Sequence, residues 1–204
     1  MNILFVCTGN TCRSPMAEAL LKDKTTEVNV QSAGIFAGNK HRANHQTITV
    51  LKDKNIDFTH QSQPVTARLL NWADLVLTMT TRHKQSIILQ YPNFSDKLFT
   101  LKEYVSEADK EVWTELKKIY ANYEEKRFKF IQENQHKFDN TILDQKLAEH
   151  LRSDIDKIQR MESSLISYDI SDPFGGELDV YQNTLSEIEH YINMLVEKLN
   201  KSKE

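Results

Sequence analysis

The chain has 204 residues, of which 39% are apolar, and its mean hydropathy is -0.56. This composition predicts a water-soluble protein with one medium-sized domain, or a small domain with an added segment. A net charge of -3 and a pI near 6.2 argue against a nucleic-acid-binding protein, and no stretch approaches the ~20 apolar residues of a membrane-spanning helix.

The N-terminal segment and the cysteine content predict the compartment. The first residues contain no basic cluster, and their apolar run stops at Val6, so we expect no signal peptide. Two cysteines, Cys7 and Cys12, are too few for a disulfide framework, and their spacing is not that of a metal site. We therefore expect a cytoplasmic protein that uses neither a metal nor a cofactor.

Short strands and helices alternate along the first half of the chain. Strands are predicted over residues 2–6, 28–34, 73–79 and 97–101. Helices are predicted from Ser14 and Pro15 onward, over 44–54 and over 81–90. The third strand is apolar throughout, as expected when both faces of a sheet are covered. This order predicts an α/β fold with a parallel sheet and right-handed crossovers.

The middle of the chain, residues 106–170, has a different composition, because it contains no Gly or Pro before Tyr168 and is rich in charge. Apolar residues recur there at three- and four-residue spacing, and Thr141 with Asp144 resembles a capping box that opens a second helix. The pattern predicts an inserted helical hairpin that either packs on itself or serves as a lid or oligomerisation element. The two stripes comprise Trp113, Leu116, Tyr120, Tyr123 and Phe130, and then Leu147, Leu151, Ile155, Ile158 and Leu165.

Pro and paired Gly residues cluster in "SDPFGGELD", residues 171–179, which predicts a shaped loop. A last helix follows, with one apolar face that we expect to pack in the core. The residues of that face are Tyr181, Leu185, Ile188, Ile192, Leu195 and Leu199.

The opening stretch carries the chemistry. Cys7 ends the first strand, and ligands of open parallel sheets bind beyond the carboxyl ends of the strands. The N–H groups of a small, flexible loop can surround one tetrahedral anion, and Arg13 adds a planar set of donors. These positive surroundings stabilise a Cys7 thiolate, to which Ser14 can donate a hydrogen bond. A lone cysteine there can also be a small core residue, but this combination favours a phosphate-type site. The loop consists of Thr8, Gly9, Asn10, Thr11 and Cys12.

The segment "VCTGNTCRSPMAEAL" resembles the phosphate loop of the low-molecular-weight protein tyrosine phosphatase family, whose hallmark is C-x5-R-S near the N-terminus. The resemblance implies a three-layer sandwich with a four-stranded parallel sheet. It covers residues 1–105 and 171–204 as a phosphatase domain and excludes the hairpin, which lengthens a connection that is usually short in this family. Further matching segments are "SAGIF" (32–36), "ADLVLTMT" (73–80), "HK" (83–84), "LFTLKEYV" (98–105) and "DPFGG" (172–176).

One position of the loop points to a branch of the family. Tyrosine-specific members usually carry Ile or Leu where this chain has Thr11, and "CTGNTCRS" together with "DPFGG" is similar to the bacterial protein-arginine phosphatase branch. A Thr hydroxyl can serve a polar guanidinium that an Ile methyl leaves unpaired. The resemblance thus implies hydrolysis of phosphoarginine, with phosphotyrosine as the alternative substrate if Thr11 only packs in the loop.

The resemblance also implies roles for individual residues. Cys7 is the nucleophile that forms a cysteinyl-phosphate, and Arg13 with the loop N–H groups, from Thr8 to Ser14, binds the phosphoryl group. Asp172 is the general acid, although Asp before Pro is also common in ordinary turns. Phe174 and Phe36 form walls of the substrate slot or else belong to the core.

Two other functions are open to this fold. Thiol-dependent arsenate reduction needs further cysteines downstream, and no cysteine follows Cys12. A non-catalytic adaptor would bind phosphorylated partners without turnover.

Cys12 itself either packs in the loop or traps an oxidised Cys7 as a disulfide. The expected partners are phosphorylated proteins rather than nucleic acid or membrane, with residues 106–170 available for self-association or partner binding.

Overall fold

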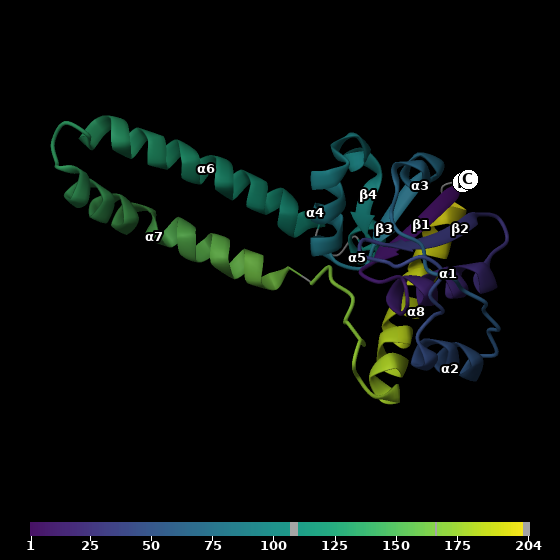
Figure 1. Ribbon diagram of the computed structural model, residues 1–204. Helices are drawn as coiled ribbons and strands as arrows, with labels where there is room; N and C mark the ends of the chain where they lie inside the picture. Colours follow the sequence, from purple (N-terminus) through teal and green to yellow (C-terminus); the bar gives the residue numbers. More distant parts are fainter. Residues whose placement is uncertain (107–109, 166, 202–204) are drawn as a thin grey trace. The chain divides into compact units, whose positions relative to one another are not determined.

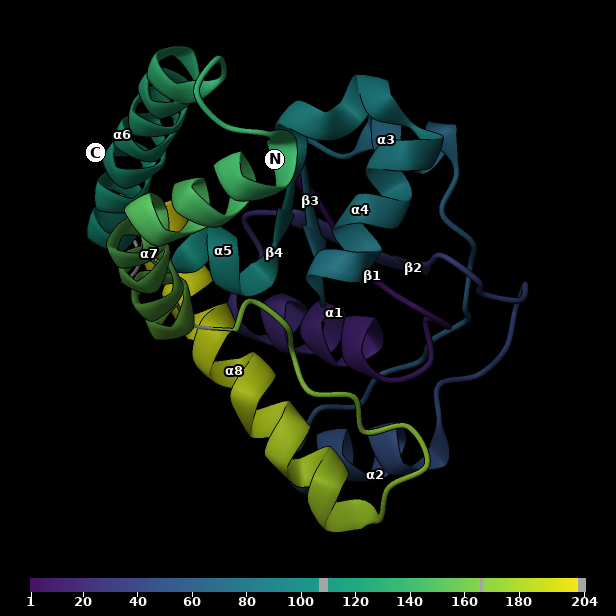
Figure 2. The same cartoon turned by 90° about the vertical axis from the view of Figure 1, so that its left-hand side faces the viewer.

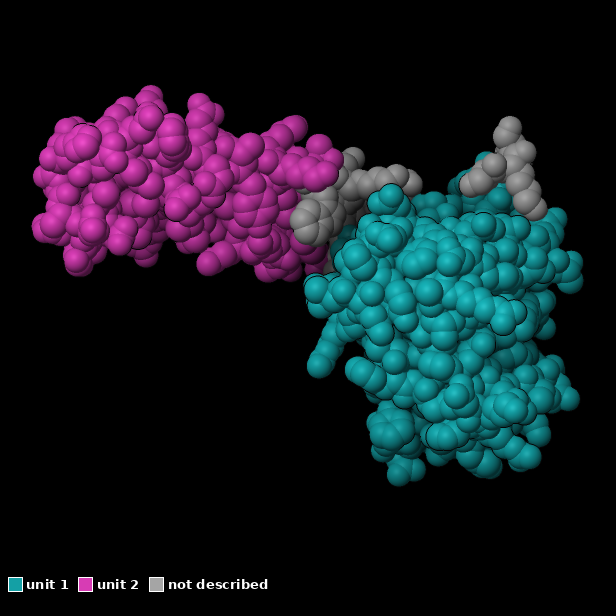
Figure 3. All heavy atoms as spheres, turned by 45° about the horizontal axis from the view of Figure 1, so that its top comes forward, with its two compact units in different colours: residues 1–106, 168–204 teal, residues 107–167 magenta. Residues whose placement is uncertain are grey.

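The computed structural model describes residues 1–106, 110–165 and 167–201 of the chain (Figure 1). The chain divides into two compact units, which Figure 3 colours separately. The first comprises Met1–Ser106 with Tyr168–Glu204 and contains the sheet, and the second comprises Glu107–Ser167 and contains two helices. Their assignment as separate domains remains a prediction.

The sheet has four parallel strands in the order β2-β1-β3-β4, which confirms the predicted fold class. The direction of the strand order reverses between β1 and β3, and such a switch point opens a crevice beyond the carboxyl ends of the strands. Cys7 is the last residue of β1 and therefore lies at this crevice. The strands are β1 (Asn2–Cys7), β2 (Asn29–Gly34), β3 (Leu75–Thr78) and β4 (Leu98–Thr100).

Side chains of β1 point alternately to two faces and so divide the core. Ile3 and Phe5 pack in a cluster with α1 and α8, whereas Leu4 and Val6 pack in a second cluster with α3 and α4. Figure 2 shows these helices on opposite sides of the sheet, which gives three layers. The helices of this unit are α1 (Arg13–Lys24), α2 (His45–Asp53), α3 (Ala67–Trp72), α4 (Thr81–Gln90), α5 (Leu101–Val105) and α8 (Leu178–Lys201).

The final helix packs as its sequence predicts. Every residue of its expected apolar face from Tyr181 to Leu195 is buried, and Leu199 packs against the same cluster. In contrast, the sequence pattern revealed neither α3, α5 nor the 3-10 helix η1 (Pro92–Lys97). Each has only five or six residues, which is too short for a helical period to stand out.

The second unit is a helical hairpin of α6 (Lys110–Asn134) and α7 (Asn140–Ser164). Leu116, Ile119 and Ile158 form its buried cluster, whereas Tyr120, expected on the apolar stripe, is exposed. Ile119 takes the inward position because the stripe drifts around a straight helix of 3.6 residues per turn. The side chain of Trp113, and residues 107–109 and 166 of the predicted segment, lie outside the described part.

The expected capping box at Thr141 and Asp144 is wrong. The N-cap of α7 is Asp139, whose carboxylate accepts a hydrogen bond from the backbone N–H of Ile142 at 2.9 Å. A carboxylate at this position also interacts favourably with the helix dipole, which makes it a stronger cap than a hydroxyl two residues further on.

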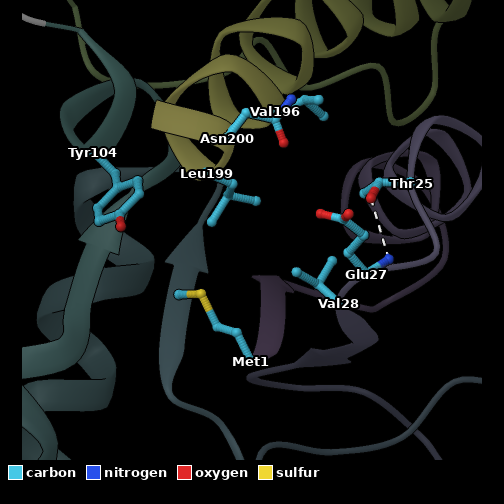
Figure 4. A pocket seen from close by; sticks show the side chains of 8 residues that line it. All are labelled: Met1, Thr25, Glu27, Val28, Tyr104, Val196, Leu199 and Asn200. Carbon is cyan, nitrogen blue, oxygen red and sulfur yellow. Dashed lines mark hydrogen bonds between the residues drawn. The ribbon is translucent and has the colours of Figure 1, made fainter. Parts of the chain in front are cut away.

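A cavity of about 350 Å³ lies at the end of β1 that is remote from Cys7 (Figure 4). None of the site residues predicted from the sequence lines it. Its walls are mainly apolar and come from the chain's start, the segment between α1 and β2, α5 and α8. The lining residues are Met1, Thr25, Glu27, Val28, Tyr104, Val196, Leu199 and Asn200.

Among the described residues, no helix is both long enough and apolar enough to span a lipid bilayer.

The carboxyl end of β2 touches the backbone of the loop that follows β1. A Cβ atom added to Gly34 would lie 2.6 Å from the carbonyl oxygen of Thr8 and 2.8 Å from the backbone nitrogen of Asn10. Neither backbone atom can yield without shifting the loop. Only glycine therefore fits between β2 and this loop.

We expect Gly34→Ala to lower the free energy of unfolding by about 1–3 kcal/mol, because the added methyl overpacks the loop backbone. Chemical denaturation measures this. Gly9→Ala is the matched control, since its Cβ would meet only the Thr11 hydroxyl, at an ordinary 3.6 Å. Equal stability of the two variants would contradict the close approach.

Candidate active site

A cavity of about 280 Å³ lies beyond the carboxyl end of β1. Eight of the eleven site residues predicted from the sequence line it, and they come from the two ends of the chain. Asn10 and Ser14 are buried and line no part of this cavity, and Phe36 lines a neighbouring one. The lining residues are Cys7, Thr8, Gly9, Thr11, Cys12, Arg13, Asp172 and Phe174.

The thiol of Cys7 forms a buried hydrogen bond with Ser14, whose Oγ lies 3.0 Å from Cys7 Sγ. Ser14 Oγ also accepts a hydrogen bond from Asn10 Nδ2 at 3.0 Å, so its own proton remains for donation. The carbonyl oxygen of Ala33 is further away, at 3.4 Å. The Ser14 hydroxyl is therefore placed to donate to the sulfur when the thiol is ionised.

The helix α1 begins at Arg13, directly after the loop, and Cys12 at its N-cap provides no side-chain cap. The first N–H groups of a helix point out of its N-terminus and carry partial positive charge. The loop and the helix start thus direct backbone donors toward the cavity beside Cys7. This is the arrangement in which proteins bind a tetrahedral anion.

Arg13 joins the two ends of the chain. Its guanidinium donates to Asp172 Oδ2 at 2.7 Å and to the carbonyl oxygen of Ile170 at 3.3 Å. The Arg13 side chain is 6% exposed and that of Asp172 is 54% exposed. The guanidinium is therefore fixed in the wall of the cavity, while the carboxylate reaches it from an accessible loop.

The loop around Asp172 is built as a tight turn. Asp172 Oδ1 accepts a hydrogen bond from the N–H of Phe174 at 3.2 Å, and the N–H of Gly176 donates to Pro173 at 2.9 Å. Gly175 adopts a φ of 80°, which favours glycine. The local turn reading of "DPFGG" is thus correct, and the same turn also carries its carboxylate to Arg13.

Phe174 and Phe36 do not belong to the core. Phe174 is 77% exposed and Phe36 is 81% exposed. Phe174 lines the cavity that contains Cys7, whereas Phe36 lines a neighbouring cavity of about 500 Å³ that shares Thr8, Arg13 and Asp172 with it. Two accessible rings therefore border the site.

The side chain of Asn10 links the loop after Cys7 to its surroundings by hydrogen bonds. Its Nδ2 donates to Ser14 at 3.0 Å and to Ser32 at 2.8 Å, and its Oδ1 accepts from the N–H of Gln63 at 3.0 Å. The residue is fully buried and has a φ of 53°, a left-handed conformation that Asn tolerates better than most residues. Both amide hydrogens donate and the amide oxygen accepts once, so three side-chain hydrogen bonds fix the curl of the loop.

This network continues to a buried carboxylate. Ser32 Oγ donates to Glu18 Oε2 at 2.6 Å, and Lys22 donates to Glu18 Oε1 at 2.5 Å. His60 Nε2 donates to the carbonyl oxygen of Asn10 at 2.8 Å, and burial lowers the pKa of His60. A neutral His60 therefore contributes a second fixed contact to the loop.

Cys12 contacts the final helix. Its sulfur lies 3.5 Å from the hydroxyl of Tyr181, and burial, followed by the contact with Cys12, raises the pKa of Tyr181. Tyr181 was expected only as a core residue, and it is buried, but it also reaches the loop. Its phenol anchors the α8 layer to the loop end.

Sequence reasoning missed the residues that support the loop from other elements, namely Glu18, Ser32, His60 and His83. Glu18, Ser32 and His83 lie within segments that carry the family resemblance, "MAEAL", "SAGIF" and "HK". That position was the only signal available, because no spacing along the chain predicts hydrogen bonds across 14 to 75 residues. In the described part of the chain, no group of three or more His, Cys, Asp or Glu side chains is placed to hold a metal ion.

Comparison with known proteins identifies relatives. The sequence profile of the family described as low molecular weight phosphotyrosine protein phosphatase matches residues 2–146. A protein-arginine-phosphatase of Bacillus subtilis (strain 168) is 34% identical, over 100% of this chain and 99% of that protein.

Two solved structures show the same fold. YwlE arginine phosphatase from Geobacillus stearothermophilus aligns with a TM-score of 0.68 and 34% identity, over 99% of this chain and 94% of that one. A YwlE cysteine-to-serine mutant with a phosphorylated active site serine aligns with a TM-score of 0.68 and 35% identity, over 98% of this chain and 97% of that one.

We expect Asn10→Gly to lower the free energy of unfolding by about 2–3 kcal/mol, because it removes three hydrogen bonds worth ~1 kcal/mol each. Glycine keeps the left-handed backbone, so strain does not contribute. Asn55→Gly is the matched control, since Asn55 has a φ of 60° and is exposed. Denaturant titration of both variants measures the difference, and equal effects would show that the network does not hold the loop.

Proposed function

The chain belongs to the low molecular weight phosphotyrosine protein phosphatase family, and we propose that it hydrolyses phosphoarginine residues of proteins through a cysteinyl-phosphate intermediate. One observation carries the choice of substrate: the similarity to a protein-arginine-phosphatase extends over the whole chain. The polar Thr11 in the wall of the Cys7 cavity agrees with that choice.

The first step is attack by Cys7. Its thiolate forms a sulfur–phosphorus bond while the phosphorus–nitrogen bond of phosphoarginine breaks in line with it. Asp172 takes up a proton from solvent before this step and gives it to the departing guanidine nitrogen, so the leaving group is neutralised as it separates. The mutant relative with a phosphorylated active site serine supports a covalent intermediate at the position of the nucleophile.

The second step releases phosphate. Asp172, now a carboxylate, takes a proton from water, the water oxygen bonds to phosphorus, and the sulfur–phosphorus bond breaks. The hydrogen bond from Ser14 at 3.0 Å stabilises the departing thiolate. Arg13 and the loop N–H groups stabilise the charge on the equatorial oxygens in both transition states.

The contact between Arg13 and Asp172 changes when the substrate binds. The guanidinium that donates to Asp172 at 2.7 Å is also the side chain proposed to bind the phosphoryl oxygens. A bound phosphoryl group competes for these donors, because bidentate pairing with phosphate suits the guanidinium plane. Asp172 is then released toward the leaving group.

Phosphotyrosine is the second candidate substrate. The family description names phosphotyrosine, and the exposed rings of Phe174 and Phe36 beside the site can border an aromatic ring. Both substrates use the same nucleophile and acid, so the choice depends on what contacts the leaving group.

We also infer a role for residues 106–170 in self-association or partner binding. The exposed apolar side chains of Tyr120, Phe128 and Ile142 on the hairpin support this inference. We further infer a cytoplasmic location, because a reducing compartment keeps the Cys7 thiol free for attack.

We expect Thr11→Ile to lower the ratio of kcat/KM for a phosphoarginine peptide over that for a phosphotyrosine peptide by about tenfold or more, because an Ile leaves the guanidinium unpaired. Steady-state kinetics on both peptides measure the ratio. Thr11→Ser keeps the hydroxyl and should keep the wild-type preference. An unchanged ratio in Thr11→Ile would mean that another residue selects the substrate.

We expect Asp172→Asn to lower kcat on a phosphoarginine peptide by about 10²-fold, because the proton donor is lost. The loss should be much smaller with p-nitrophenyl phosphate, whose leaving group departs as a stable anion. Asp179→Asn, an exposed carboxylate in the first turn of α8, is the control and should leave both rates unchanged. Equal losses on the two substrates would refute general-acid catalysis by Asp172.

A further inference from the structure

His83 is a buried histidine that the mechanism above does not use. It lies in the first turn of α4, and its backbone N–H donates to the N-cap Thr80 at 3.2 Å. The residue is only 7% exposed, although its helix is on the surface of the unit. The cap and the burial together fix the position of its ring.

The ring of His83 reaches the nucleophile's loop. Its Nε2 lies 2.8 Å from the hydroxyl oxygen of Thr8, the residue directly after Cys7. Thr8 is exposed and lines both the cavity that contains Cys7 and the neighbouring cavity that contains His83, so it connects the two.

The ring is neutral at physiological pH and carries one proton. Burial, followed by the charge of Arg13, lowers the pKa of His83 to about 4, against the weaker effects of Asp172 and Asp169. A neutral imidazole donates from one nitrogen and accepts at the other. The position of that single proton decides which atom donates between His83 and Thr8.

The surroundings of Nδ1 place the proton on Nε2. Nδ1 is buried and has no hydrogen-bond partner within the described chain. A buried N–H without an acceptor is among the rarest defects of folded proteins, more so than an unused lone pair. Nε2–H therefore donates to the Thr8 oxygen, and the proton of Thr8 is left to donate elsewhere.

We propose that His83 orients the Thr8 hydroxyl as a hydrogen-bond donor to the phosphoryl group at Cys7. Thr8 contacts the phosphoryl oxygens, so it is the binding and catalytic residue, while His83 acts through it as a positioning residue. The loop then supplies a side-chain donor in addition to its backbone N–H groups and Arg13. This inference rests on the proposed phosphatase function.

A double-mutant cycle tests the coupling between the two residues. Thr8→Val removes the hydroxyl and keeps the shape, and we expect it to lower kcat/KM on p-nitrophenyl phosphate about 10- to 100-fold. His83→Leu should lower it by a smaller factor in the wild-type background and have no further effect when Thr8 is already Val. Thr8→Ser and His83→Gln, whose amide nitrogen can replace Nε2, should both recover activity.

Two readouts separate this inference from a purely structural role. Thermal unfolding measures whether His83→Leu damages the fold, and titration calorimetry measures the affinity for inorganic phosphate without any turnover. We expect the affinity for phosphate to show the same coupling as kcat/KM. Thr49→Val, the same substitution on α2 where the hydroxyl bonds the backbone of His45, should change neither.

The inference is overturned if His83→Leu lowers activity and phosphate affinity by the same factor whether residue 8 is Thr or Val. It is also overturned if Thr8→Val leaves both quantities unchanged. If the wild-type protein binds phosphate but hydrolyses neither p-nitrophenyl phosphate nor a phosphoarginine peptide, the proposed function fails instead, and the cycle in phosphate affinity still decides the role of His83.

Discussion

The hydrogen bonds of one buried side chain, Asn10, determine the shape of the loop on which the site depends. They tie the loop to α1 through Ser14 and to β2 through Ser32, while the backbone of the same residue turns left-handed. The N–H groups of a loop curled in this way can surround a single anion. The close approach of Gly34 to the backbone of this loop limits how the loop can be placed against β2.

A second constraint comes from topology. The nucleophile stands at the end of β1, where the strand order reverses, and its proposed acid lies 165 positions later in the chain, just before α8. Arg13 connects the two, because it begins α1 and donates to both Ile170 and Asp172. The parallel sheet thus gathers a thiol, a guanidinium and a carboxylate at one edge, and the accessible Asp172 carboxylate belongs to a tight turn that presents it to the cavity.

The main secondary-structure elements and the loop after Cys7 could be predicted from the sequence, but the tertiary contacts that hold the loop could not. Strand positions, the final helix and the loop after Cys7 were predictable, because each depends on a local pattern of apolar, small or turn-forming residues. The short helices α3 and α5 lack enough turns to show a period. The contacts of Glu18, His60 and His83 with the loop or its supports depend on tertiary folding. Tyr120 was predicted to lie on the apolar stripe but is exposed, because the neighbouring Ile119 takes the buried position on this long helix.

The most direct measurement of the central claim is a rapid-quench experiment with a phosphoarginine peptide, followed by mass-spectrometric mapping of the phosphoryl group on the enzyme. We predict a transient phosphoryl group on Cys7 that forms before phosphate is released and decays at the rate of turnover. Turnover of the peptide with no phosphoryl group on Cys7 at any time, or with the group on another residue, would contradict it.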